Sequence, residues 1–273
     1  MTAAIGLPLL ALILMLMRIT GPYWWVYAWL VWCAFTLLLT VLFPILIAPL
    51  FNRFTPLSDS ELLQRIQALL ARVGFQTRGV YTMDGSRRSS HGNAYFTGLG
   101  AAKRIVFFDT LLERLQAPEI EAVLAHELGH FRLRHVRKRL VLGFAASGLM
   151  LIALSWLMQH TWFYEGLGVE PLLQARNDGL ALVLFFLVIP VFTFPFAPLS
   201  SLLSRRQEFE ADEFAARYAS SRALIDALIK LYKDNATTLT PDPIHSTFYN
   251  SHPPAAIRIE RLLKFGAPAA AAA

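Results

Sequence analysis

Long uncharged stretches alternate with charged, amphipathic segments along this chain. Residues 23–51, 140–164 and 179–204 carry no acidic or basic side chain other than one histidine, and each exceeds the roughly 20 residues that cross a bilayer. Residues 3–17 form a shorter apolar stretch, which we interpret as a marginal membrane helix, with a peripheral or cleaved segment as the alternative. The pattern predicts a mainly α-helical membrane protein with about four transmembrane helices.

The region between the second and third apolar stretches has the pattern of a folded domain. Ser58 and Glu61 form a capping-box pattern, and the apolar positions of residues 62–73 repeat at helical spacing up to Gly74. Residues 79–83, 93–97 and 105–109 are short runs rich in β-forming residues, separated by polar residues and glycine. We expect one packed helix, a small antiparallel sheet and then a helix across residues 119–135.

Composition supports membrane insertion and excludes other classes. The chain is 55% hydrophobic and 16% charged, with a mean hydropathy of +0.46, which is too apolar for an ordinary soluble domain. The net charge of +6 does not come from a basic stripe with interleaved aromatic residues, so nucleic acid is not an expected partner. The single cysteine, Cys33, excludes an intrachain disulfide and a cysteine-based metal site.

The positions of the basic residues predict the topology. Five lysine and arginine residues fall within residues 132–139, whereas the loop after residue 164 is mostly acidic. Positive residues favour the cytoplasmic side. We therefore expect two membrane helices in residues 1–51, a cytoplasmic folded region in 52–139, a transmembrane hairpin in 140–204, a cytoplasmic helical region in 205–266 and a disordered, low-complexity tail in 267–273.

The segment His126-Glu127-Leu128-Gly129-His130 carries the candidate chemistry. On a helix, residues four apart lie about 40° apart around the axis, so the two histidines can bind one metal ion. Glu127 projects about 100° from His126 and can take a proton from a water at an open metal position. By the same geometry His135 lies about 140° from His130, and we leave it out of the metal site.

A third metal ligand is expected from Glu208 or Asp212. These residues are four apart, so on one helix face one carboxylate can bind the metal while the other accepts the spare N–H of a ligating imidazole. A solvated acidic helix face is the commoner fate of such charges. The two predicted crossings between His130 and Glu208 return the chain to the same side of the membrane, so the two segments can meet.

Four motifs in this order resemble the type I CAAX prenyl proteases, which are integral-membrane zinc endopeptidases. They are the His126-to-His130 motif, the pair Glu208 and Asp212, residues 91–96 and residues 251–254. The bacterial heat-shock membrane protease HtpX is a more distant relative. The resemblance runs over residues 24–265, and it implies that the folded region of residues 52–139 is zincin-like. The family's full-length members carry further membrane helices before the segment at residue 23, so the chain resembles either a shorter relative or one lacking its N-terminal part.

The resemblance implies specific roles for the residues of the motifs. His126, His130 and Glu208 bind one zinc ion, and Glu127 is the general base. Asp212 is then the partner of a zinc-binding histidine.

Three further residues are implied by the resemblance to act on the substrate. Asn93 lies in a run similar to the family's substrate-aligning edge strand, although a structural role is the alternative. His252, followed by two prolines, resembles a histidine that reaches into the site and stabilises the oxyanion. Arg258 is expected to be a partner within the site or a substrate clamp.

We therefore expect a zinc metalloendopeptidase that cleaves membrane-associated or lipid-modified CAAX-type polypeptides. The alternatives are an HtpX-like quality-control protease of misfolded membrane proteins, or a non-catalytic membrane scaffold with a structural metal. The expected partners are a polypeptide substrate and the lipid bilayer. The expected location is the bacterial inner membrane, with the active site on the cytoplasmic side.

Overall fold

The protein divides into two compact units. The computed structural model describes residues 2–97, 103–171, 176–234 and 242–266. The first unit comprises Met1–Leu39 with Arg137–Phe196, and the second comprises Thr40–Val136 with Ala197–Ala273. The predicted disordered tail, residues 267–273, lies outside the described residues. The domain boundaries drawn from the sequence stay predictions.

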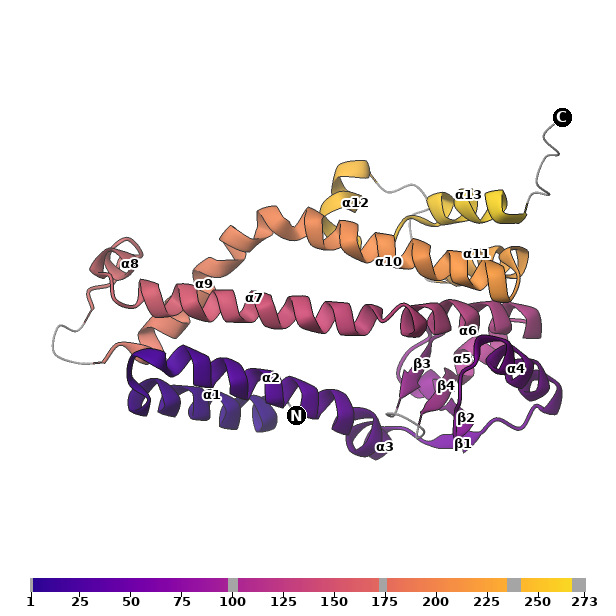
Figure 1. The fold of residues 1–273 in the computed structure, drawn as a ribbon, viewed down its shortest axis with the longest axis horizontal. Helices are drawn as coiled ribbons and strands as arrows, with labels where there is room; N and C mark the ends of the chain where they lie inside the picture. Colours follow the sequence, from indigo (N-terminus) through magenta and orange to yellow (C-terminus); the bar gives the residue numbers. More distant parts are fainter. Residues whose placement is uncertain (1, 98–102, 172–175, 235–241, 267–273) are drawn as a thin grey trace. The chain divides into compact units, whose positions relative to one another are not determined.

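Apolar helices make up the first unit. They are α1 (Thr2–Ile19), α2 (Trp24–Leu42), α7 (His135–Leu157), α8 (Thr161–Glu165) and α9 (Asp178–Thr193), coloured from indigo to salmon in Figure 1. Met17, Leu154 and Ala181 are fully buried among them, while Leu187 and Val191 on α9 are each 70% exposed. Apolar residues that face outward on this scale are expected where a protein meets lipid.

Three helical segments within the described residues are long and apolar enough to cross a membrane. They are Gly21–Phe51, His135–Leu157 and Asp178–Tyr218, and Ala3–Ile19 is a shorter apolar helix. The prediction of about four membrane helices thus corresponds to three long spans and the segment that we interpreted as marginal. A π-helical turn, Phe43–Ile47, falls within the first span and contains Pro44, as expected where a proline interrupts the helical hydrogen bonds.

The second unit contains one four-stranded sheet with the order β1-β2-β4-β3. The strands are β1 (Phe54–Pro56), β2 (Gly79–Met83), β3 (Ala94–Thr97) and β4 (Arg104–Phe108). Sequence reasoning located β2, β3 and β4 but missed β1, whose three residues are too few to show alternation. The expectation of an antiparallel sheet needs correction, because β2 and β4 pair in parallel. Strand β3 comes between β2 and β4 in the sequence, but in the sheet it pairs antiparallel with the edge of β4 that faces away from β2.

Helix α4 (Ser60–Val73) begins at a different cap from the one predicted. The side chain of Asp59 accepts hydrogen bonds from the backbone N–H groups of Glu61 and Leu62, both at 3.0 Å. Aspartate is a strong N-cap residue, so Asp59 takes the role that we assigned to Ser58. The helix ends at Gly74, whose φ of 66° is left-handed, as the sequence predicts.

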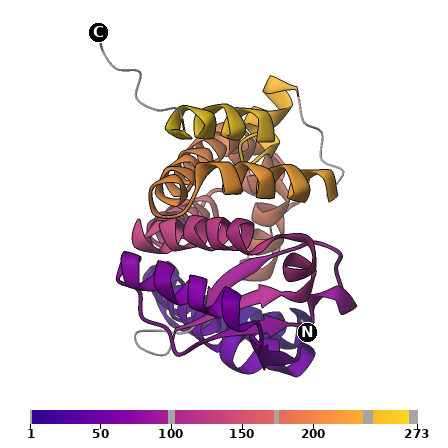
Figure 2. The same ribbon diagram turned by 90° about the vertical axis from the view of Figure 1, so that its right-hand side faces the viewer.

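Helix α6 (Ala117–Arg132) is the centre of the second unit. It begins with a capping box between Gln116 and Glu119, and its residues Leu124 and Leu128 are fully buried. Figures 1 and 2 show α6 between one layer formed by α4 and the sheet and another formed by the later helices. The remaining helices of this unit are α3 (Ala48–Phe51), α5 (Asp109–Arg114), α10 (Ala197–Tyr218), α11 (Ser221–Asp234), α12 (Pro243–Tyr249) and α13 (Ala255–Gly266).

Helices α6 and α10 approach each other closely at Gly129. A Cβ atom on this glycine would lie 3.0 Å from the Cα of Ala211 and 3.1 Å from the Cβ of Phe214. Both distances are shorter than ordinary van der Waals contact, and the first involves backbone that cannot rotate away. The glycine therefore allows the two backbones to meet at this point.

Replacing Gly129 with alanine is expected to destabilise the second unit. The added methyl group must push α6 and α10 apart, and overpacking of this kind costs about 1–3 kcal/mol. The midpoint of thermal unfolding in detergent measures the loss. Gly143→Ala on α7 is the matched control, because a Cβ there meets nothing within 4 Å and alanine favours the helix by about 0.5–1 kcal/mol. An equal or higher midpoint for Gly129→Ala than for Gly143→Ala would contradict the close approach.

Candidate metal centre

Two imidazoles of α6 face each other across one turn. The Nε2 atoms of His126 and His130 are 3.1 Å apart, and only 7% of His126 is exposed. The four-residue spacing therefore brings the two nitrogen atoms together, as the helical geometry predicts. Two ring nitrogens this close can share a metal ion between their lone pairs.

Glu208 on α10 completes this group. One of its carboxylate oxygens lies 3.6 Å from His126 Nε2 and the other lies 3.4 Å from His130 Nε2. The residue is only 2% exposed, and the ligand atoms of all three residues lie within 4.8 Å of one another. Two imidazole nitrogens and one carboxylate oxygen match the donor set of catalytic zinc, which keeps its fourth position open. The residues present therefore fit a zinc ion.

Asp212 lies on the other side of His126. Its Oδ1 is 2.9 Å from His126 Nδ1, so the aspartate contacts the ring nitrogen that faces away from Glu208 and His130. Of the two carboxylates whose roles the helix spacing left open, Glu208 is the one that faces both Nε2 atoms. A carboxylate in the position of Asp212 orients a metal-binding imidazole and sets its tautomer.

Arg258 on α13 holds Asp212 in place. Its Nε and one terminal nitrogen donate to the two carboxylate oxygens at 2.8 and 2.6 Å, and the same terminal nitrogen lies 3.5 Å from His126 Nδ1. Arg258 is 6% exposed and Asp212 is 3% exposed. This burial favours the partner role for Arg258 over the substrate clamp, since its guanidinium group is already bound inside the protein.

The surrounding carboxylates favour positive charge at the centre. Burial lowers the pKa of His126, but its hydrogen bonds with Asp212 and Glu208 outweigh that effect and raise the pKa to about 9. Burial likewise lowers the pKa of Arg258, while the ion pair with Asp212 and the nearby Glu208 raise it above its ordinary value. An environment that stabilises a proton on His126 also stabilises a bound cation.

The predicted base and the predicted oxyanion residue lie at this group. Glu127 is half-buried and follows His126 directly on α6. His252 lies between α12 and α13, with its Nδ1 2.9 Å from a carboxylate oxygen of Glu208. Its side chain is 64% exposed, in contrast to the 3% of Glu208. His252 therefore contacts the candidate ligand Glu208 from the solvent-exposed side.

Asn93 directly precedes the edge strand of the sheet. Its backbone carbonyl accepts a hydrogen bond of 2.9 Å from the backbone N–H of Phe108. Asn93 is an exposed residue. Strand β3 pairs only with β4 in the described sheet, and it lies against α6. Among the described residues no strand pairs with the outer edge of β3, and this strand contacts the helix that carries two of the candidate ligands.

His135 makes a contact that the helical spacing did not predict. Its Nδ1 lies 2.9 Å from His130 Nδ1. The angle of about 140° assumed one continuous helix, but α6 ends at Arg132 and α7 begins at His135. Arg134 between them has a left-handed φ of 57°. The candidate metal group does not include His135, yet the break between the two helices brings its ring next to the candidate ligand His130.

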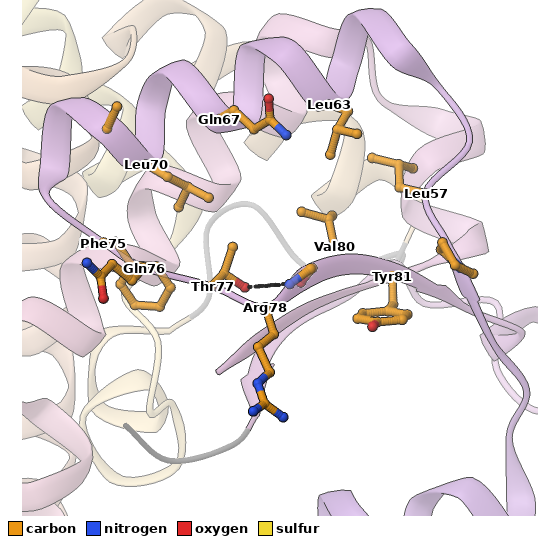
Figure 3. Close-up of a pocket in the computed structure, with 13 residues that line it drawn as sticks. Leu57, Leu63, Gln67, Leu70, Phe75, Gln76, Thr77, Arg78, Val80 and Tyr81 are labelled. Carbon is orange, nitrogen blue, oxygen red and sulfur yellow. Dashed lines mark hydrogen bonds between the residues drawn. The ribbon is translucent and has the colours of Figure 1, made fainter. Parts of the chain in front are cut away.

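A separate pocket lies elsewhere in the second unit. It has a volume of about 760 Å³ and lies between α4 and the segment leading into β2, with Gln67, Leu70, Arg78 and Tyr81 among its lining residues (Figure 3). The backbone N–H of Gly79 donates to Thr77 Oγ1 at 3.3 Å on its wall. The pocket contains none of the metal-centre residues and gives no alternative location for the chemistry.

Comparisons with known proteins agree with this geometry. The model of peptidase family M48 matches residues 56–265, and the model of the CAAX prenyl protease N-terminal region, described as five membrane helices, matches residues 1–53. CAAX prenyl protease 1 homolog of Dictyostelium discoideum is 38% identical over 91% of this chain and 58% of its own length. CAAX prenyl protease 1 of Saccharomyces cerevisiae is 36% identical over 95% of this chain and 60% of its own.

A solved structure supports the same relationship. The crystal structure of S. mikatae Ste24p covers 96% of this chain with a TM-score of 0.87 and 34% sequence identity, and the match spans 63% of that chain. The chain thus spans about three fifths of the length of the curated relatives it matches. The matching membrane-helix region, together with the apolar helices, makes this an integral membrane protein.

Proposed function

Because this chain belongs to peptidase family M48, we propose that it is a zinc-dependent endopeptidase that cleaves membrane-associated, lipid-modified polypeptides. One observation carries the proposal: His126 and His130 of α6 and Glu208 of α10 place their ligand atoms within 4.8 Å of one another. The two histidines belong to one motif, in which the carboxylate of Glu127 directly follows the first proposed ligand, His126. This is the arrangement that metal-dependent peptide hydrolysis requires.

The protein's own residues divide the remaining work. A zinc ion held by His126, His130 and Glu208 would supply Lewis acidity, which would polarise the scissile carbonyl and lower the pKa of water. Glu127 accepts the proton from the attacking water and delivers it to the leaving amine nitrogen. His252, exposed at the edge of the ligand group, donates a hydrogen bond to the carbonyl oxygen as negative charge develops there. Asp212 and Arg258 hold the ring of His126 in orientation.

The edge strand β3 is proposed to align the substrate. An extended peptide can add to a free sheet edge through main-chain hydrogen bonds, and β3 lies against the helix that carries the zinc ligands. Asn93, at the start of this strand, is placed to contact such a peptide. Backbone pairing makes few demands on the side chains of the substrate, so substrate selection would depend on another feature of the substrate.

We propose a lipid-modified CAAX-type C-terminus as that feature. The matching relatives in Dictyostelium and yeast are named CAAX prenyl proteases, and α10 carries Glu208 on the same candidate membrane segment, Asp178–Tyr218. A prenyl group in the bilayer would hold the attached peptide near that segment. Quality control of misfolded proteins, the HtpX-like alternative, is not favoured by these relatives. A structural metal would normally have four protein ligands, usually with cysteine.

The proposed location is the bacterial inner membrane with the metal centre on the cytoplasmic side. Arg132, Arg134, Arg137, Lys138 and Arg139 are all exposed around the start of α7. Basic residues next to a membrane helix favour the cytoplasmic face. Protease protection of tagged inverted vesicles would test this orientation.

Cleavage of defined peptides tests the proposed function. We expect the full chain in detergent to cleave a farnesylated CAAX peptide and to cleave its unmodified counterpart at least about tenfold more slowly, since the lipid contributes binding energy. Mass spectrometry of the products gives the cleaved bond. Activity should disappear with a chelator and return with zinc. Equal rates for both peptides would remove the lipid from substrate recognition, and cleavage that survives chelation would overturn the zinc mechanism.

A further inference from the structure

His135 is a buried histidine that the mechanism above does not use. Only 1% of the residue is exposed, and the other buried histidine, His126, is a proposed zinc ligand. Both ring nitrogens of His135 have partners: Nδ1 lies 2.9 Å from His130 Nδ1, and Nε2 lies 3.1 Å from Glu210 Oε2 on α10. His135 therefore links a proposed zinc ligand to a carboxylate.

The end of α6 is what makes this contact. A continuous helix would turn His135 about 140° away from His130. Instead the helix stops at Arg132, and Arg134 adopts a left-handed conformation with φ of 57° before α7 begins. Such a conformation costs arginine some strain, since only glycine and, to a lesser extent, asparagine adopt it readily. The left-handed conformation of Arg134 turns the backbone so that the ring of His135 lies next to that of His130.

The positions of the protons follow from the contacts. His130 Nε2 points to His126 Nε2 and Glu208, so Nε2 must present its lone pair when a metal is bound there. A neutral imidazole has a single N–H, which then lies on His130 Nδ1 and donates to His135 Nδ1. The N–H of His135 in turn lies on Nε2 and donates to Glu210. One tautomer of each ring satisfies both hydrogen bonds.

We propose that His135 and Glu210 are positioning residues that orient His130 for zinc, an inference that rests on the proposed metallopeptidase function. The other proposed histidine ligand has a similar partner, because Nδ1 of His126 lies 2.9 Å from a carboxylate oxygen of Asp212. His130 reaches its carboxylate through a second imidazole. Groups that orient metal-binding histidines in this way typically change metal affinity about 10–100-fold when they are removed.

Glu210 allows a test on a residue that is only partly buried. Its side chain is 34% exposed and its other oxygen pairs with Arg206 one turn earlier, at 3.2 Å. Glu213 on the same helix is the matched control, because its side chain is 37% exposed and pairs with Arg217 one turn later. The two glutamates differ in the contact with His135.

Zinc affinity of the full chain in detergent is the measurement, obtained by competition with a chelating indicator. We expect Glu210→Ala and His135→Ala to weaken zinc binding about 10–100-fold, and Glu213→Ala to leave it unchanged. Glu210→Gln keeps an acceptor oxygen for the N–H of His135 and should lose less than Glu210→Ala. If His135→Ala fails to fold, the comparison of Glu210→Ala with Glu213→Ala still decides.

The two proposals fail in different ways. Equal zinc affinity for Glu210→Ala and Glu213→Ala would overturn the positioning role and leave the peptidase proposal intact. A wild-type chain that binds zinc but cleaves no peptide would remove the proposed function, while the ranking of zinc affinities would still support the positioning role. A wild-type chain without zinc affinity would overturn both.

Discussion

Replacing Glu127 with glutamine is expected to lower the rate of peptide hydrolysis by about 10²–10⁴-fold, the usual contribution of a general base. The amide cannot accept a proton from water, but it has nearly the same shape as the carboxylate. Glu127 is half-buried and is not a member of the candidate ligand group, so zinc should stay bound. The rate is measured with a cleavable peptide and the metal content by elemental analysis on the same sample.

Glu208→Ala is the contrasting variant for this experiment. It removes one of three proposed ligands, so zinc and activity should be lost together. Equal activity of Glu127→Gln and the wild type would contradict the base assignment. Loss of zinc from Glu127→Gln would show instead that the carboxylate acts as a ligand, and full zinc occupancy in Glu208→Ala would remove Glu208 from the ligand set.

Replacing Arg258 with methionine is expected to cost about 3–5 kcal/mol of unfolding free energy in the metal-free protein, because it leaves Asp212 as a buried charge without its guanidinium partner. Methionine keeps much of the side-chain volume. Two of the hydrogen bonds that it removes, at 2.8 and 2.6 Å, are to this carboxylate. Thermal unfolding of the chelated protein in detergent measures the effect.

Zinc should recover part of that loss. A divalent cation next to Glu208 and His126 offsets the negative charge that Arg258 no longer balances, and any ligand that binds only the folded state raises stability. Lys264→Met on the same helix is the control, since its ion pair with Glu260 is about 70% exposed on both sides and should contribute no more than about 1 kcal/mol. A similar shift for both variants would contradict the importance of the buried pair.

Local sequence patterns predicted the features that depend on local chemistry. Runs of apolar residues mark membrane helices because the bilayer demands them residue by residue, and the resulting mainly helical membrane fold is confirmed, as is the relationship to the CAAX prenyl proteases. The four-residue spacing of His126 and His130 determines their common face in the same way. The roles of these two histidines as ligands stay predictions until a metal is measured.

Other features depended on long-range or conformational choices that the sequence does not display. The spacing of Glu208 and Asp212 predicts a shared face but does not say which carboxylate meets the Nε2 atoms, since that depends on how α10 packs against α6. The parallel pairing of β2 with β4 depends on where β3 attaches. The sequence does not mark the helix end before His135 with a glycine or a proline, because Arg134 adopts the left-handed conformation there.

The proposed ligands lie close, along both helices, to the point where α6 and α10 approach each other at Gly129 and Ala211. When the angle between α6 and α10 changes, each residue moves in proportion to its distance from the point where the helices cross. His130 and Asp212 are one residue from that point, and His126 and Glu208 are three residues, or about 4.5 Å along the axis, from it. A scissoring motion of about 10° would therefore shift them by less than about 1 Å. In such a motion the distant ends of both helices would move further than the proposed ligands.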